Sequence, residues 1–282
     1  MGLLNTGVLA GKTVFITGGS RGIGKAIALK VAKDGANVVI AAKTADKHPK
    51  LEGTIYTTAE EVEANGGKCL PIQCDLRDEE QLKSAIQKAV QHFGGLDALV
   101  NNASAISLTG TEQTSMKKYD LMNTINARGT YMASKYAIPH LKKSPNPHIL
   151  TLSPPLNVGA DSVWFTGKSV AYTIAKYGMS MCALGMAAEF RGDGIAVNTL
   201  WPRTIIWTAA VELAAPGADP NDIRKVCRKV DIQADAAYGI LSKNARSFTG
   251  NFLIDEEFLK GEGITDFKQY SEDPSVEPMV II

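Results

Sequence analysis

The sequence has little of several features that usually mark a specialised class of protein. Its 30 basic and 29 acidic residues leave a net charge of +1, and neither sign gathers in one block. This balance argues against a nucleic-acid partner and against binding to an anionic membrane surface. No uninterrupted apolar run approaches the ~20 residues of a membrane span, and the N-terminus is too short and too weakly apolar for a signal peptide. We therefore expect a soluble, unanchored protein.

Cysteine is scarce as well. The four cysteines form no Cys-x-x-Cys pair, and none of the four histidines lies at metal-ligand spacing from another ligand. This pattern predicts reduced cysteines in an intracellular protein and no metal site. Apolar residues make up 45% of the 282 residues and charged residues 21%, which is ordinary for a globular protein with a sizeable core.

What the sequence does contain is a glycine-rich turn at residues 17–24 (TGGSRGIG), between a strand-like run and a helix-like run. Such a turn presents backbone N–H groups and the positive end of the helix dipole to a phosphate. Gly18 suits the tight turn, Gly22 lets the backbone approach a pyrophosphate, and Gly24 lets the helix pack close to the strand. The turn therefore predicts a dinucleotide site. The similar loop of kinases and NTPases needs a hydroxyl where this chain has Ala26, which argues against those classes.

The second predicted strand lacks the acidic residue that binds the ribose 2′-hydroxyl in NAD-selective sites. Ala42 occupies that place, and Lys43 follows it. A carboxylate would repel a 2′-phosphate, whereas Lys43 and Arg21 offer cationic groups that can pair with one. These residues indicate NADP(H), the alternative being that both are solvated surface charges.

Strand-like and helix-like runs alternate from about residue 10 to residue 255, with no linker, internal repeat or low-complexity segment. This alternation predicts an α/β protein with a single doubly wound domain, residues 1–255, that has a seven-stranded parallel sheet and helices on both faces. Residues 256–282 form a polar, poorly defined tail in this interpretation, and residues 203–227 resemble a mobile lid. We expect the strands at residues 12–17, 36–42, 68–74, 96–100, 148–152, 194–200 and 251–255.

The predicted helix at residues 169–190 carries Tyr172 and Lys176, which lie four residues apart and so share one face. A tyrosine hydroxyl ionises at about pH 10, and a neighbouring ammonium favours the phenolate, which brings the tyrosine pKa toward the range used in acid–base catalysis. Lys176 can also donate to the nicotinamide ribose. Alone, such a pair is common and mostly structural, but after the fifth strand of a dinucleotide-binding fold it predicts a catalytic pair.

Taken in order, these motifs resemble those of the short-chain dehydrogenase/reductase family, whose members have a Rossmann-type fold. The resemblance covers nearly the whole chain and rests on TGGSRGIG, CDLRD around Asp75, NNAS at residues 101–104, NTINARGTY around Asn126, YTIAK at residues 172–176 and WPRT from Trp201. It implies that Tyr172 donates and accepts the proton, that Lys176 modulates it, and that Asn126 holds a proton-relay water. For the cofactor, the motifs and the resemblance together indicate Gly18, Gly19, Ser20, Arg21, Gly22, Ile23, Gly24, Lys43, Asp75, Asn102, Tyr172, Lys176 and Pro202.

The sequence departs from the family pattern at two places. The family has a catalytic serine after the fifth strand, and an ungapped alignment puts Pro154, not Ser153, at its position. Since proline cannot donate a hydrogen bond to a carbonyl oxygen, either the loop shifts so that Ser153 serves or this donor is absent. The usual Pro-Gly after the sixth strand is Pro202-Arg203, whose backbone has less freedom than one with glycine.

We therefore expect an NADP(H)-dependent oxidoreductase that moves a hydride between nicotinamide and a carbonyl or secondary alcohol. The expected mouth is flanked by apolar residues that would suit a lipid-like substrate, the alternative being that they pack in the core or the lid: Trp164, Phe165, Trp201, Ile205, Ile206 and Trp207. An enoyl- or dienoyl-thioester reductase and a non-catalytic NADP(H)-binding interaction module are the alternatives.

The apolar helix at residues 169–190 and the family resemblance imply a homodimer or homotetramer. The resemblance also implies a peroxisomal or mitochondrial location, although no targeting signal is visible in this chain. The sequence also resembles a family member that carries a lipid-carrier domain and a peroxisomal address after its dehydrogenase domain. Neither is visible in this sequence, and the resemblance leaves open whether the chain is a truncated form.

Overall fold

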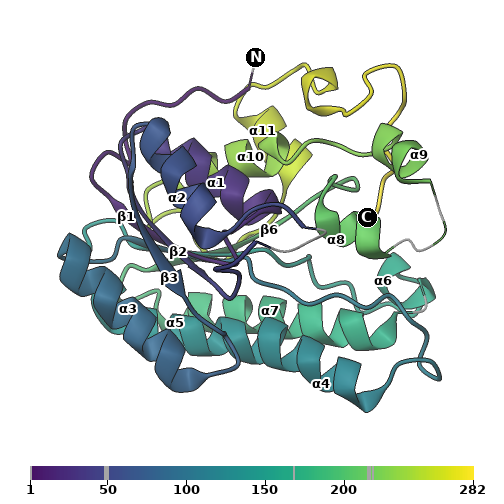
Figure 1. Ribbon diagram of the computed structural model, residues 1–282, viewed down its shortest axis with the longest axis horizontal. Helices are drawn as coiled ribbons and strands as arrows, with labels where there is room; N and C mark the ends of the chain where they lie inside the picture. The colour runs from purple at the N-terminus through teal and green to yellow at the C-terminus, as the bar shows by residue number, and fades with distance from the viewer. Residues whose placement is uncertain (1, 48–50, 168, 215–216, 218) are drawn as a thin grey trace.

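The computed structural model describes residues 2–47, 51–167, 169–214, 217 and 219–282, which are arranged round one seven-stranded sheet (Figure 1). All its strands are parallel, in the order β3-β2-β1-β4-β5-β6-β7. The chain therefore winds from β1 to one edge and then from β4 to the other, as predicted. The strands are β1 (Thr13–Thr17), β2 (Asn37–Ala42), β3 (Lys68–Gln73), β4 (Ala98–Asn101), β5 (His148–Thr151), β6 (Ala196–Trp201) and β7 (Phe252–Ile254).

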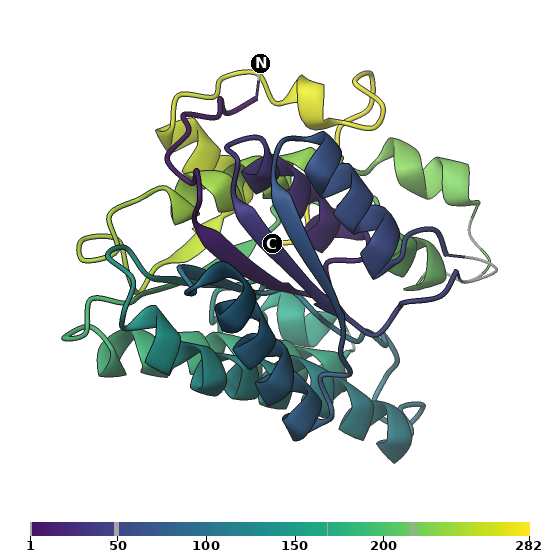
Figure 2. The ribbon, with the colours of Figure 1, turned by 60° about the vertical axis from the view of Figure 1, so that its left-hand side comes forward.

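Helices cover both faces of the sheet, which explains why β1, β4, β5 and β6 are buried along their whole length (Figures 1 and 2). Helices α1, α2 and α10 lie on one side, and α3, α5 and α7 on the other. The helices are α1 (Gly22–Ala32), α2 (Ile55–Ala64), α3 (Glu79–Phe93), α4 (Met116–Asn123), η1 (Thr124–Arg128), α5 (Gly129–Leu141), α6 (Val163–Thr166), α7 (Val170–Glu189), α8 (Ala209–Ala214), α9 (Pro220–Lys225), α10 (Asp231–Leu241), α11 (Asp255–Gly261) and η2 (Lys268–Tyr270).

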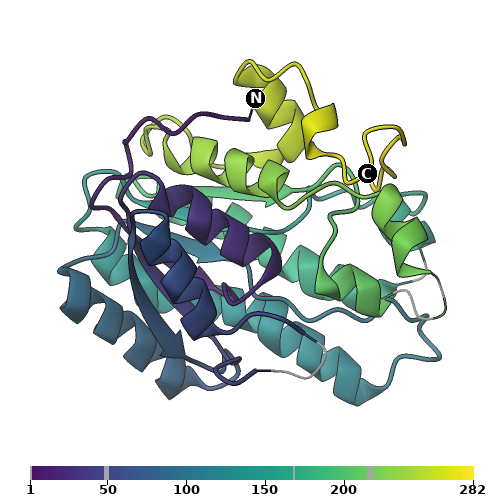
Figure 3. The same cartoon turned by 45° about the horizontal axis from the view of Figure 1, so that its top comes forward.

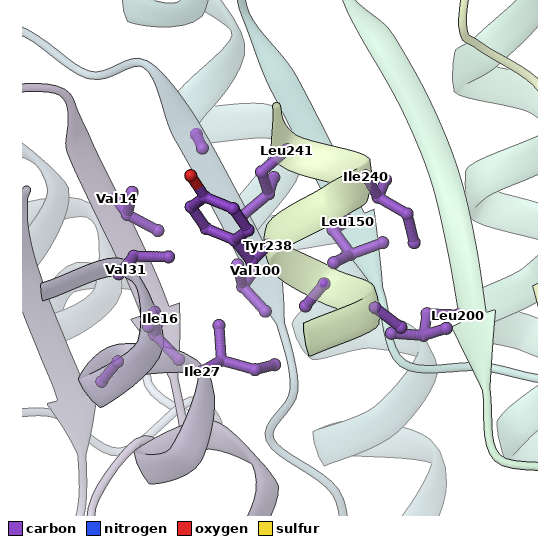
Figure 4. Packing of buried hydrophobic residues seen from close by; sticks show 14 of the residues in the cluster. Val14, Ile16, Ile27, Val31, Val100, Leu150, Leu200, Tyr238, Ile240 and Leu241 are labelled. Atoms are coloured by element: carbon purple, nitrogen blue, oxygen red, sulfur yellow. The ribbon is translucent and has the colours of Figure 1, made fainter. Parts of the chain in front are cut away.

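Alternate side chains of β1 serve two separate cores. Val14 and Ile16 pack with α1 and α10 (Figure 4), whereas Phe15 between them packs on the opposite face with α3, α5 and α7. Tyr238 of α10 is buried in the first core, and its hydroxyl donates a 2.9 Å hydrogen bond to Asp34. Because each fully buried apolar side chain contributes ~1.5–3 kcal/mol, these two layers hold the strand ends in fixed positions.

Local signals in the sequence set several helix ends. Asp78 caps α3 by accepting a 3.0 Å hydrogen bond from the backbone of Gln81, and Gly94 ends that helix in the left-handed conformation with φ +82°. In the connection after β2, α2 starts at Ile55, because Thr54 and Thr57 form a capping box. Residues 48–50 of this connection lie outside the described residues.

The C-terminal segment differs from the poorly defined tail expected for residues 256–282. It begins within α11, and Tyr270 is buried with its hydroxyl 2.7 Å from a carboxylate oxygen of Asp235. Residues 203–227, expected to form a lid, contain α8 and α9, with residues 215, 216 and 218 outside the described part. These long-range contacts have no local signal in the sequence, which explains why the segment resembled a tail.

Candidate active site

The carboxyl ends of β1, β4, β5 and β6 surround a cavity of about 1220 Å³. Parallel sheets place ligand sites at this edge, where neighbouring connections leave in opposite directions, here from β1 and β4. The residues predicted from the sequence that line it are Gly18, Ser20, Arg21, Gly22, Ile23, Lys43, Asp75, Asn102, Tyr172, Lys176 and Pro202.

The glycine-rich turn has the shape that a phosphate group needs. Gly18 and Gly22 have φ values of +70° and +57°, which residues with a side chain rarely adopt. A Cβ atom on Gly18 would lie 2.9 Å from the Cα of Ala103. Helix α1 starts at Gly22 with no side chain capping its N-terminus and no acidic residue in its first turn. Its first N–H groups and its dipole therefore suit a pyrophosphate.

Two further glycines of the turn support the site by packing and do not line the cavity. A Cβ on Gly19 would lie 3.2 Å from the side chain of Ile40, and one on Gly24 would overlap the amide nitrogen of Asn102. That amide nitrogen donates hydrogen bonds of 2.9 and 3.0 Å to the backbone oxygens of Thr17 and Gly18. Asn102 thus ties the end of β4 to the turn after β1.

Arg21 is placed differently from the sequence-based interpretation. Its guanidinium donates to the backbone oxygens of Glu52 and Gly53, at 3.0 and 2.9 Å. The side chain therefore fastens the connection before α2 to the glycine-rich turn. These bonds use two of the five N–H donors of the guanidinium and hold it against the backbone of residues 52–53. Lys43 is therefore the stronger candidate of the two for a 2′-phosphate.

Lys43 lies beside an ion pair at the end of β3. Its nitrogen is 4.0 Å from a carboxylate oxygen of Asp75, and its side chain is 72% exposed. Arg77, which also lines the cavity, donates to both carboxylate oxygens of Asp75, from Nε at 2.9 Å and from Nη2 at 2.5 Å. These bonds lower the pKa of Asp75 to about 2, so the carboxylate is ionised at neutral pH. Sequence reasoning missed Arg77, although it follows Asp75 in the CDLRD motif.

Tyr172 and Lys176 lie in the first two turns of α7, and both line the cavity. The Lys176 nitrogen donates a 3.0 Å hydrogen bond to the backbone oxygen of Leu152 and lies 5.3 Å from the centre of the Trp201 ring. Both contacts stabilise an ammonium, while burial opposes it and lowers the pKa of Lys176 to about 7.

The pKa of Tyr172 is raised by burial, against the lowering expected from a neighbouring ammonium. The physical reason is that removal from water penalises the phenolate, while the Lys176 ammonium hydrogen-bonds to Leu152. Tyr172 is therefore a protonated group, suited to donating a proton in a reduction.

Asn126 is fully buried in a π-helical turn, η1, that lies between α4 and α5. Its amide exchanges two hydrogen bonds with the backbone of Ala105, at 2.7 and 3.0 Å. It does not line the cavity; it holds the segment after Asn102 that does. Such a turn adds a residue to the helix and is often found at functional sites.

Ser153 is fully buried and does not line the cavity. Its hydroxyl has no hydrogen-bond partner among the described residues. Pro154 is buried as well, and its backbone oxygen accepts a 2.6 Å hydrogen bond from Ser180 of α7. The structure therefore brings Tyr172 and Lys176 together but leaves the predicted serine outside.

The remaining cavity wall is mostly apolar. Trp164 of α6 packs against Trp201 at the end of β6, with ring centres 5.2 Å apart. Of the other residues expected near the mouth, Ile205 and Ile206 line the cavity. Sequence reasoning missed several lining residues that long-range contacts bring in and that no local motif marks, namely Thr208, Ala209, Ala210, Val211, Ile223, Val226, Gln233, Met279 and Ile281.

A doubly wound parallel sheet with an uncapped glycine-rich turn and a Tyr-x-x-x-Lys pair in one cavity defines a nicotinamide-dinucleotide oxidoreductase fold. The family model for short chain dehydrogenase matches residues 12–216, and the chain belongs to that family. Solved structures that share this fold at low identity include a metagenomic short-chain oxidoreductase in complex with NADP, at 23% identity and a TM-score of 0.69, and carveol dehydrogenase of Mycobacterium avium in complex with NAD, at 24% and 0.75.

Curated relatives are more specific. The chain is 65% identical over 272 residues to hydroxysteroid dehydrogenase-like protein 2 of Danio rerio, and 64% identical over 273 residues to that of Homo sapiens. Each match covers 96% of this chain but only 63% of the relative's length. A crystal structure of a short chain dehydrogenase from Mycobacterium thermoresistibile is 51% identical, with a TM-score of 0.88 and coverage of 96% of this chain and 94% of that one. Within the described ranges, no helix is long and apolar enough to cross a bilayer.

Proposed function

We propose that the protein is an NADP(H)-dependent oxidoreductase that interconverts a carbonyl and a secondary alcohol. The observation that carries this proposal is that Tyr172 and Lys176 line the same cavity as the glycine-rich turn. A phosphate site alone needs no acid–base residue. A buried tyrosine beside a lysine, in the cavity that would hold the dinucleotide, supports proton transfer to a substrate bound next to that cofactor.

Each part of the cavity then has a role. The turn at residues 17–24 holds the pyrophosphate, and the bound nicotinamide supplies or receives the hydride. Tyr172 donates its hydroxyl proton to the substrate oxygen during reduction and takes one back during oxidation. Lys176 orients the ribose and favours the tyrosinate once the proton has left. Asn126 holds the backbone of Ala105 beside this pair.

Preference for NADP(H) rests on the end of β2. Ala42 lacks the carboxylate that would accept a ribose hydroxyl and repel a phosphate, and the exposed Lys43 follows it. Arg77 adds a second cation at this end of the cavity, although its partner Asp75 offsets part of its charge. Both cations attract a 2′-phosphate.

The second half of the cavity supports a lipid-like substrate. Among the described residues that line the cavity, the charged ones are Arg21, Lys43, Asp75, Arg77 and Lys176. All but Lys176 belong to the turn after β1 or to the ends of β2 and β3, where the cofactor's adenosine end belongs. The rest of the wall is apolar apart from a few uncharged polar groups.

A second reaction is favoured by one observation. Because Ser153 lies outside the cavity, it donates no hydrogen bond to the substrate oxygen, and reduction of an enoyl- or dienoyl-thioester depends less on such a donor. The product separates the two reactions, since one yields an alcohol and the other a saturated carbon–carbon bond.

The proposal is tested by mixing the purified protein with NADPH or NADH and a panel of fatty-acyl, steroid and small carbonyl compounds. We expect oxidation of NADPH with at least one apolar carbonyl and formation of the corresponding alcohol. Tight NADPH binding without turnover of any compound would favour the non-catalytic binding module instead.

We also propose that the protein self-associates through α7. Val170, Ile174, Met181 and Leu184 are all exposed on this helix, at spacings that place them along one side. A second copy of the chain would cover this apolar stripe in a homodimer or homotetramer. Sedimentation of the wild type and of Ile174→Glu checks this self-association, with a monomeric wild type as the contradicting result.

The peroxisomal or mitochondrial location stays a prediction that cell fractionation would check.

A further inference from the structure

The C-terminal segment of the chain forms part of the candidate active site. The backbone of Met279 accepts a 3.0 Å hydrogen bond from Ile205 and donates one of 2.8 Å to Val226. Two residues on, Ile281 donates a 2.9 Å hydrogen bond to the backbone of Arg203. The segment thus runs antiparallel to the chain that leaves β6, and its end lies next to α9 (Figures 1 and 3).

Its side chains alternate between two environments, as in any extended segment. Met279 and Ile281 line the cavity, whereas Val280 between them does not and is 51% exposed. Met279 is 52% exposed although it is apolar, which places it at the rim of the cavity. The same backbone pairing therefore fixes two apolar groups on the cavity side and one on the outside.

The wall near this segment is apolar too. It includes Ala209, Ala210 and Val211 of α8, Ile223 of α9, and Val226. The four charged lining residues apart from Lys176 come from the turn after β1 and the ends of β2 and β3, which β4 and β5 separate from β6. Between Tyr172 and Met279, an uncharged hydrocarbon chain would be favourably buried against the described part of the wall. A charged group would find no partner of opposite charge there.

We propose that Met279 and Ile281 form the outer wall of a groove for the hydrocarbon chain of the substrate and set the chain length that the enzyme prefers. This inference rests on the proposed function in one respect, because Tyr172 marks the end of the groove where the substrate oxygen lies. The ligand class is a linear, uncharged aliphatic chain that carries its oxygen at or near one end.

Chain length should therefore control affinity. Each methylene that leaves water contributes about 0.8 kcal/mol, or roughly a fourfold gain in affinity, until the chain passes the last apolar contact. In the wild type, affinity should rise as the ligand chain lengthens and then level off. When the side chains of the outer wall are shortened, affinity should level off at a shorter chain length.

The experiment measures the Kd of linear 2-alkanones, from hexanone to tetradecanone, in the presence of NADP+, by calorimetry. The variants are Met279→Ala, Ile281→Ala and the double variant, with Val280→Ala as the matched control on the same segment. We expect the double variant to bind the longest ketones roughly tenfold more weakly and hexanone equally well, and Val280→Ala to match the wild type throughout. Circular dichroism checks that every variant is folded.

The inference would be overturned if the double variant lost as much affinity for hexanone as for tetradecanone. It would also be overturned if Val280→Ala lost as much affinity for the long ketones as the double variant. So would a length profile that changes with protein concentration, because the wall would then come from a second copy of the chain. Binding is measured without turnover, so length-dependent binding that the double variant shortens supports the groove even if no ketone is reduced. That combination would instead count against the proposed function.

Discussion

The side-chain nitrogen of Lys176 donates a 3.0 Å hydrogen bond to the backbone oxygen of Leu152. This bond joins α7 to the end of β5 and keeps the lysine inside the protein, where it is 3% exposed. Burial lowers the pKa of Lys176 to about 7, whereas a lysine in an unfolded chain titrates at about 10.4.

Stability should therefore depend on pH through Lys176. Between about pH 7 and the higher pKa of the unfolded state, the unfolded chain binds more protons at this residue than the folded protein. Its contribution to the free energy of unfolding thus rises with pH in this window, and the cost of burying the ammonium is fully present below pH 7. Urea unfolding at pH 7 and pH 9 should show that Lys176→Met removes this rise. An unchanged pH slope in the variant would contradict the assigned pKa.

Ser153→Ala should leave turnover within about twofold of the wild type. The hydroxyl lies outside the cavity and has no hydrogen-bond partner among the described residues, so the variant should be as stable as the wild type or slightly more stable. Steady-state kinetics and chemical denaturation check both parts. A loss of kcat of a hundredfold or more, with stability unchanged, would show that Ser153 reaches the substrate.

Lys43→Asp should reverse the choice of cofactor. A charge-assisted hydrogen bond contributes about 1.5–3 kcal/mol, so the Kd for NADPH should rise roughly tenfold to a hundredfold. The Kd for NADH should stay equal or fall, because a carboxylate can accept from the ribose hydroxyl. Arg21→Ala serves as the comparison and should cost less, since Arg21 already donates to Glu52 and Gly53. Equal NADPH binding by Lys43→Asp and the wild type would place the 2′-phosphate contact elsewhere.

Asn102→Asp should destabilise the protein by about 2 kcal/mol or more. The variant keeps the shape of the side chain but loses the donor of two hydrogen bonds, to Thr17 and Gly18. The carboxylate would also face two backbone oxygens. Denaturation with and without NADPH should show the loss in both conditions, and a change below about 0.5 kcal/mol would mean that these bonds contribute little.

Much of the fold follows from local patterns in the sequence. Asp78 and Gly94 mark the ends of α3 because capping involves only neighbouring residues. The apolar runs gave all seven strands to within a few residues, and the order of motifs gave the winding of the sheet. Tyr172 and Lys176 could be paired because a helix fixes their spacing.

The failures concern contacts between distant segments. The sequence shows Arg21 as a free cation, because nothing in it tells that the backbone of residues 52–53 returns to the glycine-rich turn. The pKa of Tyr172 was expected to fall, but the expectation considered the ammonium and neglected burial. Met279 and Ile281 were not expected in the cavity, because the pairing of residues 279–281 with residues 203–205 has no sequence pattern of its own.

The most direct test of the central claim follows deuterium from 4-deuterated NADPH into an apolar ketone, with wild type and Tyr172→Phe compared by mass spectrometry. Tyr177→Phe is the matched control, because Tyr177 lies on the same helix but its hydroxyl is bonded to Asn157. We predict a deuterated alcohol from the wild type and the control, and a rate lower by roughly 10²–10⁴-fold in Tyr172→Phe with unchanged NADPH binding. Equal deuterium transfer by Tyr172→Phe and the wild type would contradict the account.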